Sequence, residues 1–287
     1  MNYTQSITRA HRTAFVLLLD GSGSMAETIR FRDREATKAE AVAAITNDLL
    51  FELIERARRY DGVRDYYDIA VLGYAGADEV RSLLDADRDL IPVTELATIR
   101  PAVRTETVEH RLPDGSIALR EIPAPAWVEP RAAGQTPMCE ALRRARDLVA
   151  AWCARPEHAE SFPPVVFNIT DGEATDCDEA ELRAVAAQIR AQRTTDGHVL
   201  LVNMHIAADG SGRTVFLPCE EEAAACPNRY AKLLWECSSE LPAAFEAAAR
   251  EAKGPGALPP FRGMSFNASA AELVTMLNIG SVSVKTE

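Results

Sequence analysis

The 287-residue chain contains no apolar run approaching the ~18–20 residues that a membrane-spanning helix needs, so we expect no membrane segment. It also has no excess of basic residues: 31 Lys and Arg are outnumbered by 43 Asp and Glu, which gives a net charge of −12. Nucleic acids and anionic membranes are bound through clustered positive charge, so this balance argues against both as partners. It suits a protein that uses a cation, or one whose partner has a basic surface.

We also expect no secretion signal, because residues 1–13 are polar and the apolar run behind them ends after six residues. Without such a signal, the six cysteines indicate reduced thiols in the cytoplasm and no disulfide framework. No C-x-x-C pair occurs, which argues against a zinc site. We interpret Cys139 as a buried structural thiol. The alternative is a thiol whose pKa is lowered by the start of a helix.

The sequence does contain a strand followed by a loop of oxygen-bearing side chains. Ala14 to Leu19 form an apolar run typical of a strand buried on both faces. Asp20 follows at once, and Ser22 and Ser24 alternate with glycines. Hard cations prefer such oxygen ligands, and the carboxyl ends of parallel strands are where ligands bind in open sheets. These three side chains are therefore candidate metal ligands, with an ordinary Gly-Ser turn as the alternative.

Strands alternate with helices along the chain, which predicts an α/β fold, a three-layer α/β/α sandwich. Its central sheet should be mostly parallel, with one antiparallel edge strand. The expected strands are 14–19, 67–74, 80–84, 165–170, 198–206, 213–217 and 262–267. The expected helices are 35–60, a helix that starts at 136–137, 178–192, 220–236 with an interruption at Pro227, 240–252 and 270–279.

We expect residues 1–287 to form a single domain, with an insertion at about 85–133 and a C-terminal elaboration at about 208–260. The insertion interrupts the alternation of strands and helices and is too small for a core of its own. Within it, the two segments 103–112 and 116–122 flank Pro113-Asp114-Gly115, which predicts a β-hairpin.

Two later loops should meet the first one at the same edge of the sheet. Thr136 lies in G-Q-T-P, and Asp171 follows a buried strand in T-D-G. Together with D-G-S-G-S at 20–24, these motifs resemble, in order, the metal-ion-dependent adhesion site of the von Willebrand factor A (VWA) domain. Taken singly, Thr136 is also consistent with a helix N-cap and Asp171 with a turn residue.

The resemblance implies that Ser22, Ser24 and Thr136 coordinate a cation through their hydroxyls, with Asp20 and Asp171 acting mainly through bound water. The expected ion is Mg2+, with Mn2+ or Ca2+ as further possibilities. It also implies a non-enzymatic adaptor, in which the cation bridges to an Asp or Glu of a partner protein. Intracellular bacterial VWA proteins associated with tellurium resistance are similar, and such proteins often act beside an ATPase, kinase or phosphatase.

The alternative function is a metal-dependent hydrolase or phosphotransferase. Ser22, Asp171 and His205 occur in the order of an α/β-hydrolase triad. However, the serine loop runs into about ten polar residues and not directly into a helix, as a nucleophile elbow would. No G-x-x-x-x-G-K-[ST] phosphate loop is present. A third possibility is a switch in which the metal moves the last helix, 270–279. We also expect Asp178 to cap the helix over 178–192.

Overall fold

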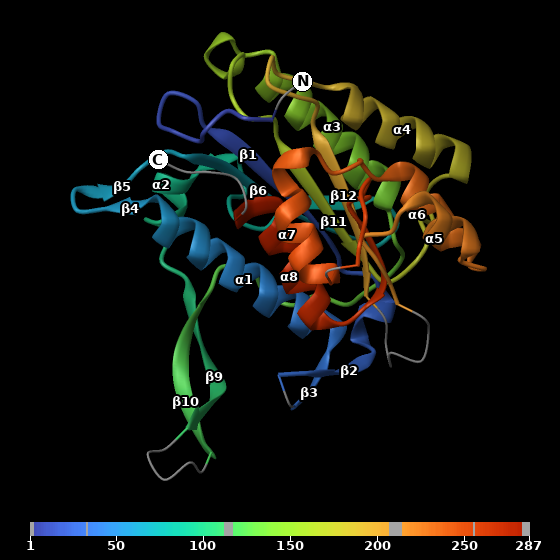
Figure 1. Ribbon diagram of the computed structural model, residues 1–287. Coiled ribbons are helices and arrows are strands. Elements are labelled where there is room, and N and C mark those ends of the chain that lie inside the picture. The colour runs from blue at the N-terminus through green and yellow to red at the C-terminus, as the bar shows by residue number, and fades with distance from the viewer. Residues whose placement is uncertain (1–2, 33, 112–116, 207–213, 255, 283–287) are drawn as a thin grey trace.

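The computed structural model describes residues 3–32, 34–111, 117–206, 214–254 and 256–282, and its centre is an eight-stranded sheet (Figure 1). The strand order is β13-β14-β12-β11-β1-β6-β7, and β8 also pairs with β6. The pairs from β14 to β6 are parallel. The strands are β1 (Thr13–Asp20), β6 (Tyr67–Ala75), β7 (Glu79–Ser82), β8 (Ile91–Pro92), β11 (Val165–Thr170), β12 (Leu200–Ile206), β13 (Val215–Phe216) and β14 (Met264–Ala268).

The α/β fold with a mostly parallel sheet is therefore confirmed. Antiparallel pairing is more extensive than expected, because it occurs at both edges. On one side β7 and β8 run antiparallel to β6, and on the other β13 runs antiparallel to β14. The strand β13 lies within the strand expected at 213–217, whereas β8 has only two residues, which is too short for a periodic pattern to reveal a strand.

Helices cover both faces of the sheet, because the side chains of β1 alternate between two cores. The helices are α1 (Lys38–Ala57), α2 (Val93–Leu96), α3 (Met138–Cys153), α4 (Glu179–Ala191), α5 (Glu220–Ala225), α6 (Arg229–Cys237), α7 (Ala243–Lys253) and α8 (Ala270–Val282). Phe15 and Leu17 pack with α1, α2, α7 and α8, whereas Val16 and Leu18 pack with α3, α4 and α6. The resulting three layers are visible in Figure 1.

The first long helix starts later than predicted, at Lys38 instead of residue 35, because a small hairpin precedes it. Strands β2 (Thr28–Phe31) and β3 (Arg34–Thr37) pair antiparallel. In β2, Ile29 and Phe31 are buried and their neighbours are exposed, the period of two that marks a strand. Thr37 then forms a capping box with Glu40, which fixes the start of α1.

The predicted β-hairpin in the insertion is confirmed and projects from the body of the molecule (Figure 1). It consists of β9 (Ala102–Arg111) and β10 (Ile117–Ala126), paired antiparallel with Ile117 opposite Arg111. Its predicted turn at 113–115 lies outside the described residues. Two further short strands, β4 (Arg58–Arg59) and β5 (Gly62–Val63), follow α1.

The base of the projecting hairpin is attached to α1 through one buried amide. Asn47 Oδ1 accepts hydrogen bonds from the backbone N–H groups of Trp127 (2.8 Å) and Val128 (2.9 Å), and Asn47 Nδ2 donates to the Val128 carbonyl (2.9 Å). We expect Asn47→Ala to lower the free energy of unfolding by about 2 kcal/mol, because it leaves buried backbone groups without partners. Urea unfolding measures the change, and a loss below about 0.5 kcal/mol would contradict this anchoring role.

The C-terminal part follows the predicted order of elements. The interruption expected at Pro227 is confirmed, because the helical stretch over 220–236 is divided into α5 and α6, and Asn228 caps α6 by accepting the N–H of Ala231 (3.0 Å). Ser269 caps the last helix, because its Oγ accepts the N–H of Glu272 (3.3 Å) and Glu272 Oε2 accepts the N–H of Ser269 (2.7 Å). In the part of the chain that the structure describes, every helix is too short or too polar to span a bilayer. The assignment of 1–287 to one domain stays a prediction.

Candidate metal centre

Asp20 ends β1 and connects the first loop to the neighbouring strand β11. Its Oδ1 accepts the backbone N–H of Ser22 (2.8 Å), and its Oδ2 accepts the hydroxyl of Thr170 (2.7 Å). The side chain is almost fully buried. Burial raises the pKa of Asp20, its hydrogen bonds to Ser22 and Thr170 lower it, and the nearby charge of Asp171 raises it further. Asp20 therefore holds the loop in place and brings negative charge into the site.

The hydroxyls of the same loop reach the carboxylate of the third loop. Ser22 Oγ lies 3.2 Å from Ser24 Oγ, and Ser24 Oγ donates to Asp171 Oδ1 at 2.6 Å. Ser22 is buried, whereas Ser24 is exposed, so of these two hydroxyls only that of Ser24 is at the surface. Hydrogen bonds thus connect the side chains of Ser22, Ser24 and Asp171. Asp20 joins this group by accepting the backbone N–H of Ser22.

The loop of Thr136 lies beside the serine loop. The N–H of Gly23 donates to the Gly134 carbonyl (2.9 Å). Gly134 has φ +78°, and a Cβ there would come within 2.6 Å of Gly76 Cα, so this close approach requires glycine. The Thr136 N–H donates to Thr175 Oγ1 (3.0 Å), and its carbonyl accepts from Thr175 N (3.0 Å). Its hydroxyl takes part in none of the hydrogen bonds found among the described residues. The hydroxyl oxygen is therefore available as a metal ligand.

Thr136 is not the N-cap that its position before Pro137 suggested. Helix α3 begins at Met138, and its first N–H groups are capped from another loop. Asp176 accepts from the N–H groups of Cys139 (3.0 Å) and Glu140 (2.8 Å) with its two carboxylate oxygens. Because the carboxylate of Asp176 caps the helix, the hydroxyl of Thr136 is not needed as its cap.

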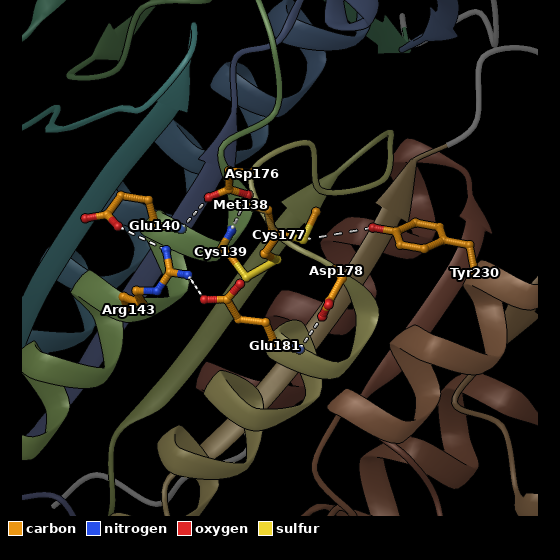
Figure 2. The surroundings of a disulfide bond; sticks show 9 residues. All are labelled: Met138, Cys139, Glu140, Arg143, Asp176, Cys177, Asp178, Glu181 and Tyr230. Atoms are coloured by element: carbon orange, nitrogen blue, oxygen red, sulfur yellow. Dashed lines mark hydrogen bonds and ion pairs between the residues drawn. A yellow bond between two sulfur atoms is a disulfide. The ribbon is translucent and has the colours of Figure 1, made fainter.

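A disulfide bond joins the second and third loops, which corrects the prediction that all six cysteines are reduced thiols. Cys139, in the first turn of α3, is bonded to Cys177, which precedes α4 (Figure 2). Cys139 is therefore not a free buried thiol. Arg143 strengthens the same connection, because it forms ion pairs with Glu140 in α3 and with Glu181 in α4 (Figure 2). Neither thiol is part of a C-x-x-C pattern, and the partners are 38 residues apart, so sequence spacing did not reveal the pair.

Lys38 enters the site from the first turn of α1. Its Nζ donates to Asp171 Oδ2 (2.9 Å) and to Glu27 Oε2 (2.7 Å). The lysine side chain is 4% exposed and that of Asp171 is 0% exposed, so this is a buried ion pair. Burial lowers the pKa of Lys38, but the hydrogen bonds and charges of Glu27 and Asp171 outweigh it and raise the pKa overall. Lys38 is therefore charged at neutral pH.

A chain of polar side chains lies in the sheet next to the site. The hydroxyl of Tyr74 donates to Asn168 Oδ1 (3.0 Å), Asn168 Nδ2 donates to Asn203 Oδ1 (3.1 Å), and Asn203 Nδ2 donates to Ser238 Oγ (3.0 Å). Asn168 and Asn203 stand opposite each other in the register of β11 and β12. An asparagine in the middle of each of two apolar strands was the sequence signal for this pairing.

His205, the third member of the alternative triad, packs against β14. Its ring stacks on Phe266 with 4.4 Å between centroids, and its Nδ1 accepts the N–H of Asn267 (3.3 Å). Burial lowers the pKa of His205 to about 4, against the opposing charge of Asp171, so the ring is neutral at pH 7. Among the described residues His205 has no hydrogen bond to Ser22. This arrangement does not favour a nucleophile activated by His205.

A cavity of about 540 Å³ borders the third loop and the start of α4. Its lining includes Glu173, Cys177 and Tyr230, and the Tyr230 hydroxyl donates to the Gly172 carbonyl (2.6 Å). None of the five predicted metal-site residues lines it. The predicted cap of α4 is confirmed, because Asp178 accepts the N–H of Glu181 (2.8 Å).

The chemistry of these residues fits a hard divalent cation. The oxygens come from hydroxyls and carboxylates, the ligand types that Mg2+ and Mn2+ prefer. Glu27 and Asp171 pair with the ammonium of Lys38, and Asp20 adjoins the same loops through Ser22 and Thr170, so carboxylates outnumber the ammonium among these residues. Ser24 is exposed, so an ion beside it is accessible from solvent.

No protein-family model matches the chain, and no curated protein matches it. Among solved structures it is similar to a von Willebrand factor type A protein from Catenulispora acidiphila (15% identity, TM-score 0.41), with 69% of this chain and 34% of that chain covered. It is also similar to three N-terminal domains of the type V pili tip protein Mfa5 from Porphyromonas gingivalis (14%, TM-score 0.32; 57% and 20% covered). A third is an uncharacterized membrane spanning protein from Vibrio fischeri (14%, TM-score 0.28; 68% and 71% covered).

The chain thus spans about a third of the length of the first of these proteins and a fifth of the second. With TM-scores below 0.5, the three likenesses concern the general course of the chain only.

Proposed function

We propose that this protein is a divalent-metal-dependent protein-binding module, with Ser22, Ser24, Thr136, Asp20 and Asp171 as the residues of the metal site. One observation supports this above the others. Ser24 Oγ lies 3.2 Å from Ser22 Oγ and 2.6 Å from Asp171 Oδ1, although Ser24 and Asp171 are 147 positions apart in the sequence. Mg2+ is the expected ion, with Mn2+ or Ca2+ as further possibilities.

Each of these residues has a distinct role in the proposal. Ser22 and Ser24 supply neutral oxygens, and the unpaired hydroxyl of Thr136 supplies a third. Asp20 and Asp171 bring the negative charge and hold the loops in position. A cation bound mainly by neutral hydroxyls keeps enough positive charge to accept a carboxylate from outside. We therefore propose a partner protein that presents an Asp or Glu to the exposed side of the site, next to Ser24.

Metal binding is tested by isothermal titration calorimetry with MnCl2 on the full chain. We expect one ion per chain, and we expect Ser24→Ala to weaken binding by about tenfold or more, because it removes a ligand. Ser82→Ala is the matched control, since Ser82 lies on the edge strand β7 outside the site. Equal binding by the Ser24→Ala and wild-type proteins would overturn the assignment of the site.

Partner binding needs a second measurement. The tagged chain is used to capture proteins from native lysate in Mg2+ and in EDTA, with Asp20→Ala as the control bait. A partner that meets the proposal is retained only in Mg2+, is lost with Asp20→Ala, and is released when one of its own Asp or Glu residues is replaced by Ala. Metal-dependent turnover of a phosphoester or ester that is lost with Ser22→Ala would instead favour the hydrolase alternative.

A further inference from the structure

We propose that Lys38 is a built-in competitor for the metal site, an ammonium that shares Asp171 with the bound cation and weakens divalent-metal binding by the chain alone. This inference rests on the proposed function, because it concerns the same carboxylate. It starts from an unusual position: Lys38 is the first residue of α1, where the positive end of the helix dipole disfavours a cation. Such a position is stable only because carboxylates compensate for it.

The contacts of Lys38 leave it little freedom to move away. Its Nζ is held between Asp171 Oδ2 at 2.9 Å and Glu27 Oε2 at 2.7 Å. Its backbone N–H donates to the Glu27 carbonyl at 2.9 Å, and the hairpin of β2 and β3 closes the chain between the two residues. The side chain is 4% exposed, so it has no solvated position within easy reach.

Both oxygens of Asp171 are therefore in use, one by the Ser24 hydroxyl and the other by the ammonium. A divalent ion that joins Ser22 and Ser24 would share the carboxylate with Lys38. Two like charges on one buried carboxylate repel each other strongly, because little water separates them. The ammonium consequently lowers the affinity for the ion. It also offsets part of the negative charge that would otherwise repel a partner's carboxylate from the ion-loaded site.

The test is titration of the full chain with MnCl2 as the only ligand, by calorimetry and by thermal shift. Lys38→Met keeps the length and apolar stem of the side chain and removes the charge. We expect it to bind Mn2+ at least about tenfold more tightly than wild type and to gain more thermal stability from Mn2+. Lys38→Arg keeps the charge and should bind no more tightly than wild type. Lys253→Met, which breaks a separate ion pair with Glu222, is the matched control and should resemble wild type.

The outcomes separate this inference from the proposed function. If wild type binds Mn2+ through Ser24 and Lys38→Met binds equally or more weakly while remaining folded by circular dichroism, the role of Lys38 is overturned and the metal site stands. If Lys38→Met gains affinity and loses it again in Lys38→Met/Ser24→Ala, the inference is supported. If neither wild type nor Lys38→Met binds Mn2+, both proposals fall.

Discussion

Replacement of Asp171 by Asn is expected to lower the free energy of unfolding by about 3–5 kcal/mol in EDTA, because it leaves a buried charge without its partner. Lys38 and Asp171 form a pair whose side chains are 4% and 0% exposed. The remaining partner, Glu27, has a side chain that is 56% exposed and is more strongly screened by water. An uncompensated ammonium in this position costs more than the lost hydrogen bond itself.

The comparison uses urea unfolding of wild type and variant in EDTA at neutral pH, so that metal binding does not contribute. Asp61→Asn is the matched control, because it removes a carboxylate from an exposed ion pair with Arg64 and should change stability little. In the double variant Lys38→Met/Asp171→Asn, the destabilisation should be smaller than the sum of the two single changes. Strict additivity would show that the two side chains do not stabilise each other.

Much of the fold and the arrangement of the site followed from local patterns. The apolar run at 14–19 predicted a strand buried on both faces, and Asp20 predicted where that strand ends. Because β1 and β11 are parallel and adjacent, the ends of both strands had to bring Asp20 and Asp171 to one edge. Hydrophobic pattern and sheet topology thus predicted the strands and the edge at which their ends meet wherever a segment was long and regular.

The features that the sequence did not reveal depend on contacts between distant segments. Lys38 lies 133 positions from Asp171, and nothing around it in the sequence distinguishes it from a solvated lysine at the start of a helix. The capping of α3 by Asp176 similarly joins separate loops. Thr136 before Pro137 gave a plausible local cap, but the carboxylate of Asp176 caps the helix instead. Local propensity identifies candidates for such roles, and packing selects among them.

The disulfide also joins two segments that are distant in the sequence, and its loss is expected to have a large effect on the free energy of unfolding. Loss of the Cys139–Cys177 bond, by reduction or by the double change Cys139→Ser/Cys177→Ser, should lower the free energy of unfolding by about 2–4 kcal/mol. The bond closes a loop of 38 residues that contains most of α3 and all of β11, so its removal gives the unfolded chain considerable additional freedom. Urea unfolding with and without reductant measures this difference.

Cys153→Ser is the matched control, because Cys153 is an unpaired cysteine at the end of the same helix. It should keep the sensitivity to reductant, whereas the double variant should lose it. The hydrogen bonds of Asp176 and Thr175 still connect the two loops after the bond is broken, so the chain should remain folded in reductant. The loop of Thr136 would nevertheless be held less firmly against that of Asp171. The affinity for Mn2+ should therefore fall together with the free energy of unfolding. Unchanged stability in reductant would mean that these hydrogen bonds alone hold the two loops together.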